Sequence, residues 1–264
     1  MSDNESELAP AHRVEPLLDF PDASRLRALT PARVALGRTG VSLPTRAHLD
    51  FDRCHAMARE AVHARLETAA LANTLRNSAG HDVLCLHSAA TDRATYLQRP
   101  DLGRMLDEPS EKLITQSAAT SPFDLALIVA DGLSALAVER HAAPLIEVFL
   151  PMVAGWRLAP ISIVEQGRVA IGDRIGAMFD AQVAVILIGE RPGLSSPDSL
   201  GVYITWDPRP GRTDAERNCI SNIHAEGLSY AQAAAQLSAI LGEARRLRLT
   251  GVALKPPALS LPKG

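Results

Sequence analysis

The sequence is poor in cysteine and in aromatic side chains, and both shortages limit what the chain can be. Its 264 residues include three cysteines, Cys54, Cys85 and Cys219, which lie too far apart to form a C-x-x-C pair. This spacing argues against a disulfide framework and a cysteine zinc site, and it favours a reducing compartment. Aromatic residues make up only 4%, so alanine, leucine and valine have to fill the core.

The chain also lacks a strong charge of either sign and a long apolar run. Its formal net charge is -3, which gives no electrostatic reason to expect a nucleic acid or an anionic membrane as partner. No apolar stretch is long enough to cross a bilayer, and the acidic, polar N-terminus does not resemble a secretory signal. We therefore predict a cytoplasmic protein with no membrane and no nucleic acid among its partners.

The usual signatures of cofactor and catalytic sites are missing as well. No G-x-G-x-x-G follows an apolar run, and neither G-x-x-x-x-G-K-[ST] nor G-x-S-x-G occurs. The histidines His48, His55 and His63 lie in a helical pattern, where solvated or packed side chains are more usual than metal ligands. We predict no catalytic residue and no metal ligand in this chain.

Short apolar runs alternate with helical patterns after residue 80. The predicted strands are 83–87, 123–129, 158–164, 183–188 and 202–206. The predicted helices are 134–153, 173–179 and 230–247. Continuously apolar strands between helices are typical of a parallel sheet that is covered on both faces. The fold class is therefore predicted to be α/β, with a Rossmann-like parallel sheet flanked by helices over residues 80–254.

The two ends of the chain have a different character. Residues 1–29 carry prolines among acidic and small residues and predict a flexible N-terminal arm. Residues 30–79 predict an extended strap, punctuated by Gly and Pro, and then an amphipathic helix over about 47–76. Residues 255–264 predict a disordered tail.

Ligands of open α/β sheets bind outside the carboxyl ends of the strands, and three predicted loops lie there. The loop 130–134 contains an Asp-Gly pair, which is equally consistent with a simple turn. The loop 189–194 presents Glu190 between glycines and a proline, and a surface ion pair is the structural alternative. The loop 218–224 carries Cys219, for which a buried structural thiol is the alternative.

Five segments together resemble the small subunit of adenosylcobalamin-dependent ethanolamine ammonia-lyase. They are 96–104 (YLQRPDLGR), 128–134 (IVADGLS), 183–194 (VAVILIGERPGL), 198–201 (DSLG) and 218–224 (NCISNIH). They follow the family's order, and the resemblance runs from roughly residue 30 to residue 254. The combination of GERPGL with CISNIH is highly specific, although the loop before Asn218 is one residue shorter than the family pattern.

The resemblance implies a complex that holds adenosylcobalamin at the interface with a large subunit, a TIM barrel. The large subunit carries the substrate and most of the radical chemistry, which converts ethanolamine to acetaldehyde and ammonia. In this family the small subunit contacts the corrinoid through a valine, the glutamate of GERPGL and the cysteine of CISNIH, which are Val169, Glu190 and Cys219 here. The resemblance also implies no activity without the large subunit, a higher hetero-oligomer, and a place in the cytoplasm or a bacterial microcompartment.

Two other functions remain compatible with the residues. The main alternative is a stand-alone cobalamin-carrying or regulatory module without a catalytic partner. A Rossmann oxidoreductase is disfavoured because the glycine fingerprint is missing.

The segment 222–227 (NIHAEG) resembles the D-x-H-x-x-G motif through which other cobalamin enzymes bind cobalt by a histidine. Here Asn222 stands in place of the aspartate. A ligating histidine normally donates its other ring nitrogen to a carboxylate, which Asn222 replaces poorly. We therefore interpret His224 as a residue that is either structural or supports the cofactor contacts without binding cobalt, and the resemblance implies that the cofactor keeps its own dimethylbenzimidazole as lower ligand.

Overall fold

The structure is a computed structural model that describes residues 23–30, 32–117 and 121–255. Residues 1–22 of the predicted arm and 256–264 of the predicted tail lie outside the described residues. By its internal contacts the chain divides into two units, residues 1–56 and 57–264, which are described separately. Within the described ranges, no helix is long and apolar enough to cross a membrane.

The first unit contains α1 (Ala23–Leu29) and the beginning of α2 (Thr45–His63), which ends in the second unit. Residues 23–29 of the predicted arm are thus helical. The predicted strap between the helices is mostly irregular, with one β-bridge between Thr39 and Ser42.

The second unit holds the remaining elements. Its strands are β1 (Val83–His87), β2 (Phe123–Ala130), β3 (Ile161–Glu165), β4 (Ala181–Gly189), β5 (Leu200–Trp206) and β6 (Arg217–Ile223). Its α-helices are α3 (Thr68–Ala79), α4 (Arg93–Gln98), α5 (Glu108–Ser117), α6 (Ala135–Phe149), α7 (Ile171–Met178) and α8 (Tyr230–Leu247). Short 3-10 helices lie at η1 (Leu102–Arg104), η2 (Leu150–Val153) and η3 (Asp214–Glu216).

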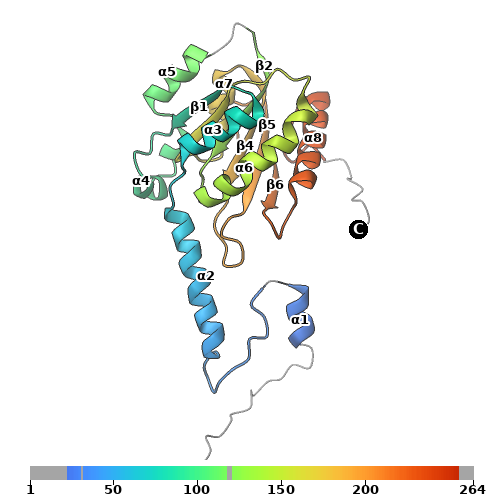
Figure 1. The fold of residues 1–264 in the computed structure, drawn as a ribbon. Coiled ribbons are helices and arrows are strands. Elements are labelled where there is room, and N and C mark those ends of the chain that lie inside the picture. The colour runs from blue at the N-terminus through green and yellow to red at the C-terminus, as the bar shows by residue number, and fades with distance from the viewer. Residues whose placement is uncertain (1–22, 31, 118–120, 256–264) are drawn as a thin grey trace, which may run out of the picture. The chain divides into compact units, whose positions relative to one another are not determined.

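The six strands form one mixed sheet in the order β1-β3-β2-β4-β5-β6 (Figure 1). The first four strands pair in parallel, whereas β5 is antiparallel to both β4 and β6. The predicted α/β class and the flanking helices are confirmed, but the prediction of a parallel sheet is wrong for its last two strands. The connections 190–199 and 207–216 contain no α-helix, and a parallel pair needs a longer crossover.

Both faces of the sheet are covered by helices, which explains why its strands are continuously apolar. Alternate residues of a strand point to opposite faces. Leu125 and Leu127 of β2 pack in a core with α3, α6 and α8, whereas Ala126 and Ile128 pack in a second core with α5 and α7. The same two groups of helices lie on the two sides of the sheet in Figure 1.

Two other sequence predictions are wrong in detail. The helix expected over 47–76 is two helices, α2 and α3, separated at residues 64–67. Leu66 in this break is buried in the same core as Leu71 of α3, so the apolar spacing continues although the helix does not. The segment 218–224 was expected to be a loop, but it forms most of β6. Its polar residues suggested a loop because they occupy the solvent-facing positions of an edge strand.

Candidate functional site

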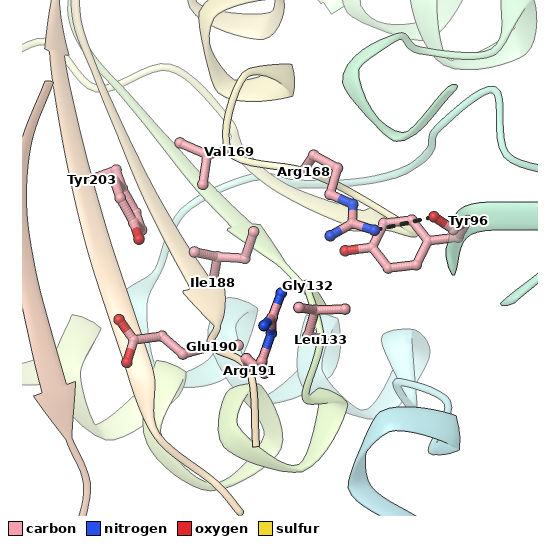
Figure 2. A pocket seen from close by; sticks show the side chains of 10 residues that line it. Tyr96, Gly132, Leu133, Arg168, Val169, Ile188, Glu190, Arg191 and Tyr203 are labelled. Carbon is pink, nitrogen blue, oxygen red and sulfur yellow. Dashed lines mark hydrogen bonds between the residues drawn. The ribbon is translucent and has the colours of Figure 1, made fainter. Parts of the chain in front are cut away.

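The carboxyl ends of the parallel strands meet at one edge of the sheet, as expected for a ligand site. The segments that follow β2, β3 and β4 line a pocket of about 380 Å³ there (Figure 2). Val169 and Glu190, two of the three predicted cofactor contacts, both line it. Val169 follows β3 and Glu190 follows β4, so the sheet brings together residues that lie apart in the sequence.

The floor of the pocket depends on two glycines whose backbones touch. Gly132 has a φ of +57°, and a Cβ at this position would overlap the carbonyl oxygen of Gly189. A Cβ on Gly189 would lie 2.6 Å from the carbonyl oxygen of Asp131. The backbone N–H of Leu133 donates to the carbonyl oxygen of Gly189 at 2.9 Å. These contacts hold the loops after β2 and β4 together at the pocket.

Glu190 is fixed by the neighbouring strand β5. Its backbone N–H donates to the carbonyl oxygen of Ser199 at 2.9 Å, and its Oε2 accepts from the Ser199 hydroxyl at 2.9 Å. Gly201 leaves room for the carboxylate, since a Cβ there would lie 2.6 Å from Oε1. No salt bridge joins Glu190 to Arg191 in the described structure. The carboxylate is therefore positioned and half-buried without a cationic partner of its own.

Cys219, the third predicted contact, lies beside the pocket instead of lining it. It is opposite Tyr203 in the register of β5 and β6, and Tyr203 lines the pocket. The side chain is exposed, so a buried structural thiol is the wrong interpretation. Partial removal of the sulfur from water raises the pKa of the thiol, and the negative charge of Glu190 raises it further. The hydrogen bond from the Tyr203 hydroxyl lowers this pKa, and the net direction is upward. Cys219 is therefore a neutral thiol at neutral pH.

A cluster around Tyr96 was missed by the sequence reasoning. Tyr96 of α4 is fully buried, and its hydroxyl donates to the carbonyl oxygen of Gly167 at 3.1 Å. The guanidinium carbons of Arg93 and Arg168 lie 4.8 Å and 4.1 Å from the centre of its ring. Tyr96 and Arg168 also line the pocket (Figure 2). The available signal was the position of Arg168 next to Val169 and of Tyr96 in the segment YLQRPDLGR.

The Asp-Gly pair after β2 has a structural role in this edge of the sheet. Asp131 is 1% exposed, and its Oδ2 lies 3.4 Å from Nη1 of Arg93. Its Oδ1 accepts from the backbone N–H of Gly167 at 3.1 Å. Burial raises the pKa of Asp131 to about 6, although Arg93 and the backbone N–H groups lower it. The buried pair ties the loop after β2 to the turn after β3 from behind the pocket.

His224 is held in the turn that follows β6. Its Nε2 lies 2.8 Å from Oδ1 of Asn222 and 3.3 Å from the Ser196 hydroxyl. A Cβ on Gly227 would lie 2.7 Å from the same nitrogen, so the ring is closely packed. The described residues include no group of three or more His, Cys, Asp or Glu side chains that could hold a metal ion. These contacts support a structural interpretation of His224.

Comparison with known proteins gives one consistent result. The family model of the ethanolamine ammonia-lyase light chain (EutC) matches residues 21–255. The ethanolamine ammonia-lyase small subunit of Pseudomonas aeruginosa is 57% identical over 249 residues, which cover 90% of this chain and 91% of that protein. The small subunit of Ralstonia nicotianae is 60% identical over 237 residues, which cover 88% and 87%. That of Xanthomonas campestris pv. campestris is 57% identical over 239 residues, which cover 89% and 88%.

Proposed function

Because the chain belongs to the family of ethanolamine ammonia-lyase light chains, we propose that it helps to hold adenosylcobalamin at the interface with a large catalytic subunit. In this proposal the complex converts ethanolamine to acetaldehyde and ammonia, and the small subunit has no activity alone. The observation that carries the proposal is the pocket at the sheet edge. It brings Val169 and Glu190 together and leaves Cys219 one side chain away.

The residues of the pocket fit part of a corrinoid. Leu133, Val169 and Ile188 offer an apolar surface, and the corrin ring carries neutral amides at its periphery. The carboxylate of Glu190 can accept hydrogen bonds from such amides. When bound, the cofactor supplies a cobalt–carbon bond whose homolysis begins the radical reaction. The residues of this chain would bind and orient the corrin.

The size of the pocket supports a shared site. Its volume of about 380 Å³ lies near the lower end of the roughly 300–1,000 Å³ that enclose a drug-sized ligand. A corrinoid with its nucleotide tail is much larger than such a ligand. We propose that a second chain covers most of the cofactor, as expected for a small subunit that works only in a complex.

Helix α2 supports the same partner. It has 19 residues, and within this fully described helix only Ala61 is buried. Leu49 is 61% exposed and Met57 is 44% exposed. Most of the stability of a helix in a protein comes from the packing of its apolar face, so burial against another chain would stabilise α2. We propose that the large subunit, a TIM barrel in a higher hetero-oligomer, covers this helix.

Three finer points belong to the same proposal. We propose that the parallel strands β1, β3, β2 and β4 with their helices are a Rossmann-like core; β5 and β6 add Tyr203 and Cys219 to it. The domain boundaries, residues 30–79 and 80–254, stay predictions. So do the cytoplasmic location and packaging in a bacterial microcompartment.

The test is to express the chain with and without an ethanolamine ammonia-lyase large subunit. We expect cobalamin-dependent release of acetaldehyde from the complex and none from either chain alone. If the complex releases no acetaldehyde in the presence of cobalamin, the proposal is refuted. Tight binding of cobalamin by the chain alone would favour the stand-alone module.

The role of Glu190 is tested in the same complex with Glu190→Gln. Loss of the charge-assisted acceptor should weaken cofactor binding by about 1.5–3 kcal/mol, or roughly 10- to 150-fold. The kcat at saturating cofactor should change much less, because the groups that react would lie on the large subunit. Glu226→Gln is the matched control, since Glu226 is exposed and does not line the pocket. Equal affinity in wild type and Glu190→Gln would contradict the assignment.

A further inference from the structure

Arg168 is a cation in the pocket for which the structure shows no carboxylate partner among the described residues. Its Nη2 donates to the backbone oxygen of Tyr96 at 3.1 Å, and its Nε is buried without a hydrogen-bond partner. Arg93, beside the same ring, also has a buried nitrogen without a partner, Nη2, but its charge is paired with Asp131. A buried donor without an acceptor costs free energy, and a ligand or an ordered water that supplies the acceptor removes this cost.

The guanidinium of Arg168 is held in place before any ligand arrives. It is stacked on Tyr96, and the backbone N–H of Arg168 donates to the carbonyl oxygen of Gly103 at 2.8 Å. A Cβ on Gly103 would lie 2.8 Å from Cγ of Arg168, so this glycine makes room for the side chain. A fixed guanidinium loses little side-chain entropy when it binds a ligand.

The charges fixed inside the pocket are separated. In Figure 2, Arg168 and Tyr96 lie on one side of Ile188, Glu190 and Tyr203 lie on the other, and the exposed side chain of Arg191 lies between the two sides. An anion is attracted to the Arg168 side and repelled from the Glu190 side, where amide N–H groups find an acceptor. The pocket is therefore suited to a ligand that carries one anionic group and neutral amides at different places.

Cobalamin has this distribution of groups, because its corrin amides are neutral and the phosphodiester of its nucleotide tail is its one anionic group. Guanidinium groups bind phosphate oxygens through two parallel hydrogen bonds. We propose, on the basis of the function proposed above, that Arg168 binds the phosphodiester of the cofactor's nucleotide tail. The amides of the corrin then face Glu190.

The test compares two corrinoids on the complex of both subunits. Adenosylcobalamin has the nucleotide tail, and adenosylcobinamide lacks it together with the phosphodiester. Arg168→Gln should weaken binding of adenosylcobalamin by about 10- to 100-fold and leave binding of adenosylcobinamide within about threefold of wild type. Arg246→Gln removes one positive charge from an exposed side chain of α8 that does not line the pocket, and it should change both affinities by less than about threefold.

A second measurement reports on the phosphodiester directly. The phosphorus-31 resonance of bound cyanocobalamin should differ in position from that of the free cofactor, and Arg168→Gln should remove most of this difference. Arg168→Lys keeps the charge but not the planar pair of donors, and it should restore only part of the affinity. Unchanged binding of adenosylcobinamide shows in addition that the variant site is folded.

Other outcomes would overturn the inference. If Arg168→Gln weakens both corrinoids equally, or neither, and leaves the phosphorus-31 resonance of the bound cofactor in place, Arg168 does not bind the phosphodiester. If the wild-type complex binds neither corrinoid, the proposed function itself fails, and this inference fails with it.

Discussion

Replacing Gly132 by alanine should weaken the fold and the pocket together, because two separate costs meet at this residue. Its φ of +57° lies in the left-handed region, where a Cβ costs roughly 1–2 kcal/mol. The added Cβ would also lie 2.5 Å from Cγ1 of Ile188 and would overlap the carbonyl oxygen of Gly189. Forcing such an atom into a packed site costs about 1–3 kcal/mol more.

One effect of the substitution opposes these costs. Alanine restricts the unfolded chain more than glycine does, which stabilises the folded state by about 0.4–1 kcal/mol. The net loss in the free energy of unfolding is therefore about 1–4 kcal/mol. For a chain of this size such a loss lowers Tm by roughly 2–15 °C.

The assay is urea unfolding of the full chain followed by circular dichroism, with Gly242→Ala as the control. Gly242 lies inside α8, and a Cβ there would meet nothing within 4 Å. That variant should gain about 0.5–1 kcal/mol, because alanine favours a helix over glycine. In the complex, Gly132→Ala should also bind cobalamin more weakly than wild type. If the urea concentration at the unfolding midpoint of Gly132→Ala equals that of wild type, the backbones of the two loops are not in contact as described.

Three further predictions address acid stability, the cobalt ligand and the N-terminal segment. The backbone N–H of Thr213 and the guanidinium of Arg212 lower the pKa of Glu216 to about 2. The carboxylate therefore stabilises the folded chain fully above its pKa in the unfolded chain, about 4.3, and this stabilisation is lost as the pH falls towards 2. Glu216→Gln should therefore flatten the dependence of Tm on pH between about 5 and 2, and an unchanged slope would contradict this. Labelling the histidines with nitrogen-15 should leave the superhyperfine splitting of cob(II)alamin in the complex unchanged, whereas a change from triplet to doublet would place His224 on the cobalt. Deletion of residues 1–22 should leave acetaldehyde release per complex unchanged, and lost turnover in a folded complex would mean that part of the site lies there.

The sequence predicts the positions of the strands better than their directions. β2 and β4 are recognisable because both of their faces are buried, which produces continuous apolar runs. α8 begins at the predicted residue, where the capping box of Ser229 and Gln232 fixes its start. The antiparallel direction of β5 has no signature in its own residues. It follows from a connection too short for a helical crossover, and β6 escapes notice because an edge strand carries polar residues on its open side.

The candidate site was also predicted only in part from the sequence. Val169 and Glu190 were predicted by resemblance, and the fold explains their meeting by the shared carboxyl edge of β3 and β4. The contact of Arg168 with Tyr96 joins positions 72 residues apart, and no spacing in the sequence predicts such a pair. Sequence reasoning finds residues that belong to a motif, whereas it misses residues whose role arises from tertiary contacts alone.

The interactions behind the pocket decide how the cofactor would be bound. The buried pair of Asp131 and Arg93 and the touching backbones of Gly132 and Gly189 fix three loops without using the side chain of any residue that is proposed to contact the corrin. A surface fixed in this way loses little conformational entropy on binding, so its anchors act at nearly full strength. The weakness expected of the isolated chain then has another cause, namely the part of the corrinoid that stays exposed to water until the large subunit covers it. Substitutions behind the pocket should consequently reduce stability and affinity together by loosening the loops, whereas substitutions of Glu190 or Arg168 should reduce affinity more than stability.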